Sequence, residues 1–64
     1  TNADSIVGQK GRVTEAIHNA TGAGRVLVGG DDWKVECEED LPAGTVVRVV
    51  ARESIVLQVE AVKK

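Results

Sequence analysis

The chain has 64 residues, a net charge of −2 and a single cysteine, Cys37. One cysteine excludes an internal disulfide, and Cys37 with His18, the single histidine, supplies too few ligands for a zinc site. The acidic balance argues against a nucleic-acid binder, since such proteins usually carry a basic surface. We therefore expect one small domain, held by apolar packing, with no cofactor, no metal and no catalytic residue.

Twelve valines, separated by short glycine-rich or polar segments, predict an all-β chain. In chain order, the predicted strands cover residues 10–17, 25–28, 33–37, 45–51 and 55–62. The segments between them, HNATGAG, GGDD, EEDLPAG and RES, carry the turn residues. No stretch shows the 3.6-residue period of a helix, and no apolar run reaches the roughly 20 residues of a membrane span. The sequence therefore predicts one domain over 1–64, in which residues 1–7 form a linker.

The first hairpin places its apolar side chains on one face. If GGDD is a four-residue loop, Val28 lies opposite Trp33 and Val26 lies opposite Val35. The predicted core consists of Val13, Val26, Val28, Trp33, Val35, Val47, Val49, Leu57 and Val59, with Ile17, Cys37, Leu41 and Ile55 at the strand ends. Five short strands bury such a face best by closing, so we expect a small five-stranded Greek-key barrel of the OB-fold type. Trp33 is then expected to fill the barrel interior. Its replacement by alanine is expected to lower the free energy of unfolding by about 3–5 kcal/mol.

The last hairpin defines a second register. If RES is a three-residue loop, Val49 lies opposite Leu57 and Val50 lies opposite Val56. The last residue of such a loop usually takes a positive φ, which we expect at Ser54. The outward-facing residues of this hairpin and one outward leucine form a candidate interaction surface, which consists of Leu27, Val46, Val50, Val56 and Val62.

Other motifs point to no chemistry. GAGRVLVGG resembles a dinucleotide-binding loop, but Leu27 occupies the third glycine position and a strand follows. Cys37 with His18 as its base would be a nucleophile pair, yet Cys37 is in phase with Trp33 and Val35 and is expected to pack as a small apolar residue. The acidic segment at 38–40 is expected to be a solvated loop.

These features together resemble the C-terminal soluble domain of the NfeD proteins, especially their short membrane-anchored form. The resemblance extends from Ile6 to Val62 and depends on the order and spacing of several weak motifs. The matching positions are Gly8 and Gly11; Gly24, Val26 and Val28; Trp33; Leu41, Gly44, Val47 and Val49; Leu57 and Val59. Ser54 departs from the pattern, because the family often has glycine in this hairpin.

The resemblance implies a function as well as a fold. It implies an OB-type barrel attached to transmembrane helices that precede residue 1. It also implies a scaffold or accessory role beside membrane proteins of the stomatin, prohibitin and flotillin type, with no enzymatic activity and no small-molecule substrate. The free Cys37 suits a reducing compartment and favours the cytoplasmic side of the membrane. The alternative is an OB-fold domain that binds single-stranded nucleic acid, although the strand faces lack stacking aromatics.

Overall fold

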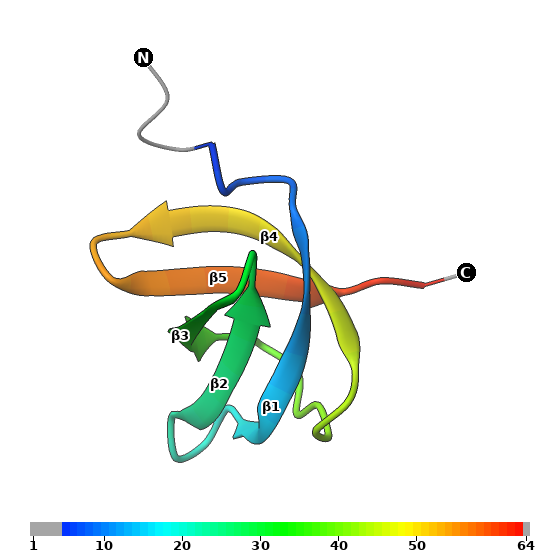
Figure 1. Ribbon diagram of the computed structural model, residues 1–64. Helices are drawn as coiled ribbons and strands as arrows, with labels where there is room; N and C mark the ends of the chain where they lie inside the picture. The colour runs from blue at the N-terminus through cyan, green and yellow to red at the C-terminus, as the bar shows by residue number, and fades with distance from the viewer. Residues whose placement is uncertain (1–4, 64) are drawn as a thin grey trace.

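The computed structural model describes residues 5–63 and consists of five strands closed into a barrel (Figure 1). The strands are β1 (Lys10–His18), β2 (Ala23–Val28), β3 (Asp31–Glu36), β4 (Val46–Glu53) and β5 (Val56–Ala61). Their order around the barrel is β1-β2-β3-β5-β4, with β3 and β5 parallel and the other neighbours antiparallel. This all-β closed barrel confirms the predicted fold class.

The turn between β2 and β3 is shorter than predicted. Val28 pairs with Asp31, so the loop consists of Gly29 and Gly30, whose φ angles are 60° and 87°. Two consecutive positive φ angles are typical of the two-residue type I′ hairpin turn, which glycine adopts without steric cost. The predicted four-residue loop is therefore wrong, and Trp33 lies opposite Val26. The displacement is two residues, so every side chain keeps its predicted face.

The turn between β4 and β5 also has two residues, Ser54 and Ile55, because Glu53 pairs with Val56. The predicted RES loop, and with it the opposition of Val50 to Val56, is wrong. The positive φ at Ser54, 57°, is nevertheless present. Ser54 is the first residue of this turn and the only non-glycine residue between 5 and 63 with a positive φ, as in a type II′ turn.

A β-bulge in β4 accounts for the rest of the changed register. Val49 pairs with Val59, whereas Ala51 pairs with Gln58, so Val50 is an extra residue on the β4 side. Such an insertion shifts the inward and outward positions of the residues that follow it. Ala51 therefore lies on the outer face with Val50, and the predicted opposition of Val49 to Leu57 is wrong.

The barrel interior is aliphatic. The buried residues are Val13, Ile17, Val26, Val28, Val35, Leu41, Val47, Val49, Leu57 and Val59. Ile6, Trp33, Cys37 and Ala61 are partly buried and pack against this core. Ile55 is 69% exposed, contrary to the expectation that it closes the core, because it lies at the tip of the β4–β5 hairpin, which extends past the barrel (Figure 1).

Part of the predicted linker contacts the barrel. Residues 1–4 lie outside the described residues. Ile6, within the predicted linker, packs against the core. Directly after the predicted linker, the backbone N–H of Gly8 donates to the Val49 carbonyl at 2.8 Å. This contact extends the β1–β4 pairing by one step beyond Lys10.

Trp33 lies at one end of the barrel and is partly exposed, so it caps the core instead of filling it. The residue beside Trp33 is Arg52, and the β4 bulge explains why. Because of the bulge, the inward-facing Leu57 pairs with Arg52 and not with Val49, its predicted partner. The Arg52 guanidinium lies 5.0 Å from the centre of the indole ring, within the range of a cation–π contact. The indole Nε1 is buried and has no hydrogen-bond partner among the described residues.

We expect Trp33→Ala to lower the free energy of unfolding by about 2 kcal/mol, below the range for a fully buried tryptophan, because part of the ring is already in water. Chemical denaturation followed by circular dichroism measures this change. A loss of stability as large as that expected for a fully buried ring would contradict the capping position.

Gly11 allows β1 and β2 to approach closely. A Cβ at Gly11 would lie 2.5 Å from Val28 Cγ2 and 2.6 Å from the Leu27 carbonyl oxygen. We expect Gly11→Ala to destabilise the fold by about 1–3 kcal/mol, since a backbone atom must move. Gly44→Ala is the control for strain without a clash, because Gly44 has a φ of 95° and open space around its Cβ position. Unchanged thermal unfolding of Gly11→Ala would show that the two strands separate easily.

Ser54 holds a backbone conformation that glycine adopts at lower cost. We expect Ser54→Gly to raise the free energy of unfolding by about 0.5–1 kcal/mol, partly offset by the greater freedom of glycine in the unfolded chain. Urea denaturation of the two proteins measures the difference. A less stable glycine variant would mean that contacts of the serine outweigh the strain at its φ.

Candidate protein-interaction groove

The predicted interaction residues do not form one patch. Leu27 and Val50 are 43% and 45% exposed, and the other three are half-buried. Arg12 pairs with both Leu27 and Val46, so a charged residue separates these two. Val46 lies beside Val62, whose backbone N–H donates to the Val46 carbonyl at 3.0 Å.

Val50 and Val56 lie further along the β4–β5 hairpin. Between them and Val46, the outer face carries the cross-strand pair of Arg48 and Glu60. Charged side chains thus divide the five residues into three parts: Leu27, then Val46 with Val62, and then Val50 and Val56. The predicted register implied one continuous valine surface on the β4–β5 hairpin. The observed register does not form such a surface among residues 5–63.

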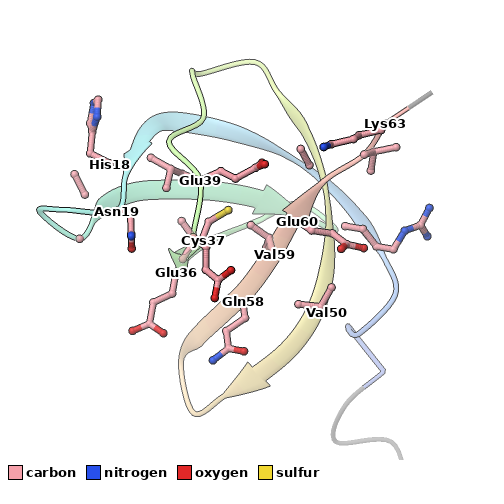
Figure 2. Close-up of a pocket in the computed structure, with 18 residues that line it drawn as sticks. His18, Asn19, Glu36, Cys37, Glu39, Val50, Gln58, Val59, Glu60 and Lys63 are labelled. Carbon is pink, nitrogen blue, oxygen red and sulfur yellow. The ribbon is translucent and has the colours of Figure 1, made fainter.

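An open groove of about 1030 Å³ lies beside the second half of β5, and its lining does not include Trp33 (Figure 2). It runs between the second half of β5 and the chain that follows β3. The residues that form its apolar part are Ile17, Ala23, Val35, Cys37, Val50, Val59, Ala61 and Val62. The groove therefore includes two of the five predicted interaction residues, Val50 and Val62.

The groove exists because β5 is paired with β3 over a short length. The parallel pairing runs from Lys34↔Val56 to Glu36↔Gln58. After Glu36 the chain turns away, and Leu41 pairs with Ile17 at the end of β1. Backbone hydrogen bonds of 2.7 and 3.0 Å hold Ile17 to Leu41 in both directions.

The rim of the groove is acidic. Its lining contains four acidic residues, Glu36, Glu38, Glu39 and Glu60, and two basic residues, Arg48 and Lys63. Within residues 5–63, the one ion pair joins Arg25 to Asp32 at 3.0 Å, outside this groove. Arg48 donates instead to the Gly8 carbonyl at 3.3 Å. The four groove glutamates are thus available to attract a cationic group.

Cys37 and His18 both line the groove, but their side chains are directed differently. In Figure 2 the thiol of Cys37 points toward the centre of the groove, whereas the His18 ring is directed away from it. Cys37 is a free thiol that packs against the core. The two side chains are therefore not directed toward one another, as a nucleophile and its base would be, and the core contact of Cys37 agrees with a small packing residue.

Residues 38–40 are exposed, as the prediction of a solvated loop requires, but the sequence pattern does not reveal that Glu38 and Glu39 line a groove. Asp40 does have a structural contact, because its Oδ1 accepts the backbone N–H of Asn19 at 2.9 Å and connects two loops. No signal in the sequence reveals the groove, because β3 and β5 have six residues each and strand length does not distinguish them. Their register pairs the second half of β3 with the first half of β5, and this offset leaves the second half of β5 uncovered.

Residues 5–63 contain neither a candidate membrane-spanning helix nor a candidate metal-binding cluster. In this part of the chain, no helix has the length and apolar character needed to cross a bilayer. Likewise, these residues contain no group of three or more His, Cys, Asp or Glu side chains placed to hold a metal ion.

Two solved structures share this architecture. The C-terminal domain of stomatin operon partner protein 1510-C from Pyrococcus horikoshii matches with a TM-score of 0.83 and 27% identity, over 100% of this chain and 98% of that one. The soluble domain of a Corynebacterium glutamicum membrane protein, implicated in regulation of membrane protease activity, matches with a TM-score of 0.78 and 20% identity, over 88% and 90% of the two chains. The second likeness supports the fold alone.

Sequence comparison leads to the same group. The inner membrane protein YbbJ of Escherichia coli (strain K12) is 49% identical over 41 residues, which are 64% of this chain and 27% of YbbJ. The chain thus corresponds to a minor part of that relative's length. Residues 3–60 match the family model of the NfeD-like C-terminal, partner-binding domain. The chain therefore belongs to the NfeD-like C-terminal domain family, as the motifs from Gly8 to Val59 predicted.

Proposed function

We propose that this domain is a non-catalytic protein-interaction module of a membrane-anchored accessory protein. Its partners are membrane proteins of the stomatin, prohibitin and flotillin type. The observation that carries the proposal is the match of residues 3–60 to a family whose members are described as partner-binding domains. The name of the Pyrococcus horikoshii relative, a stomatin operon partner protein, supports the partner type.

Membrane attachment is part of the proposal. YbbJ is an inner membrane protein, and the Corynebacterium glutamicum domain is the soluble part of a membrane protein. We place the domain on the cytoplasmic side, because the free thiol of Cys37 suits a reducing compartment. In this position the barrel would be presented to the soluble parts of neighbouring membrane proteins.

The alternative, binding of single-stranded nucleic acid, has less support. A nucleic-acid groove attracts phosphates with cations and stacks bases on aromatic rings. The groove described above is lined by four glutamates, which repel phosphate. Trp33, the single aromatic residue of the chain, does not line the groove and is already covered by Arg52.

The proposal predicts saturable binding of the immobilised domain to a purified stomatin-type membrane protein from the same organism, in detergent, at about 0.15 M salt. Biolayer interferometry measures the binding, and a single-stranded DNA oligonucleotide is the matched competitor. We expect the membrane protein to bind and the oligonucleotide to leave that binding unchanged. Binding of the oligonucleotide, with none of the stomatin-, prohibitin- or flotillin-type proteins bound, would favour the nucleic-acid alternative.

A further inference from the structure

One edge of β5 is uncovered along the groove. In an antiparallel pair, successive residues direct their N–H and C=O groups alternately toward and away from the partner strand. Val62 donates its N–H to Val46 on β4, so residues 60 and 62 direct their backbone groups toward β4. Val59 and Ala61 therefore direct theirs to the other side of β5.

The β4 side of the same ladder follows this alternation. Val49, which pairs with Val59, donates its N–H to the Gln9 carbonyl and accepts from the Gly8 N–H, both on the side away from β5. The backbone groups of Val59 and Ala61 must point the opposite way, toward the position of β3. There the described β3–β5 pairing ends with Glu36 and Gln58, a parallel pair that engages the N–H of the next residue, Val59. The uncovered backbone groups are therefore the Val59 carbonyl and both groups of Ala61, beside the groove.

The side chains around this edge differ between its two faces. On the inner side, Cys37, Val59 and Ala61 pack against the core and present apolar surface. On the outer side, Glu60 and the nearby Glu36 are exposed carboxylates. A strand laid along β5 would have alternate side chains on these two faces. The added strand would place apolar side chains on the apolar inner face and cationic side chains on the acidic outer face.

We propose that a partner protein adds an extended segment of alternating apolar and basic residues as a strand along residues 59–63 of β5. Strand addition to an open sheet edge obtains affinity from main-chain hydrogen bonds and specificity from the alternate side chains. The proposal rests on the proposed function, since it assigns the mode by which the domain holds its protein partner. It commits to an extended basic segment because the acidic rim would repel an acidic one.

The probe is an eight-residue, N-acetylated and C-amidated peptide of alternating valine and lysine, titrated into the 64-residue chain. We expect two-dimensional ¹H–¹⁵N NMR to show shifts at the amides of residues 36–39 and 59–63. Hydrogen exchange at the Ala61 amide should slow in the complex, because its N–H acquires an acceptor. A peptide of alternating valine and glutamate is expected not to bind.

Charge reversal tests the acidic rim without altering the strand edge. We expect Glu60→Lys to weaken binding of the valine–lysine peptide about fivefold. Glu53→Lys is the matched control, since Glu53 lies on the exposed far end of the same hairpin, away from the groove. The Glu53→Lys variant should bind the valine–lysine peptide with the same affinity as the unaltered chain. Equal effects of the two reversals would overturn the assignment to the groove.

Shifts confined to the Trp33 end of the barrel, or no binding at millimolar peptide, would also overturn this inference. These results are distinguishable from a failure of the proposed function. If the stomatin-type protein binds the Glu60→Lys domain as strongly as the unaltered one, the interaction function stands and the β5 edge is not its site. If the peptide binds at the edge but no membrane protein does, the strand edge stands and the choice of partner type fails.

Discussion

The parallel pairing of β3 with β5 is the constraint on which the rest of the molecule depends. It closes the barrel, and closure is the means by which a chain of 64 residues buries one valine-rich face without a disulfide or a second layer. Yet the pairing joins Lys34–Glu36 to Val56–Gln58 and ends there. The same contact that completes the core therefore leaves the second half of β5 uncovered and creates the groove.

Two local devices adapt the strands to this closure. The bulge at Val50 turns β4 so that Arg52, not Ala51, reaches the inner side of the sheet, where it covers Trp33. At β1, Gly11 permits an approach to β2 that no Cβ would allow. The barrel is thus covered at Trp33 by an indole and a guanidinium, whereas the groove beside β5 remains open and acidic. This asymmetry makes the groove the better candidate for contact with a partner.

Two of the five interaction residues that the strand pattern predicted lie in the candidate groove. Val50 and Val62, two of the proposed interaction residues, line the groove, but Leu27 lies elsewhere and is separated from Val46 by Arg12. A strand pattern tells which residues face solvent. It does not tell which solvent-facing residues are neighbours, since that depends on the register of strands distant in sequence.

The alternation of valine with polar residues determined the inside and outside of the barrel, because the side-chain period of a strand is two and an error of two residues changes no face. Thus Val26 and Val35 are buried although both hairpin loops were predicted too long. The tertiary structure decided the turn lengths, the Val50 bulge, the half-exposed position of Trp33 and the open edge at Ala61. These features arise from the register in which strands distant in sequence pair around a closed ring, a condition that no single segment of sequence contains.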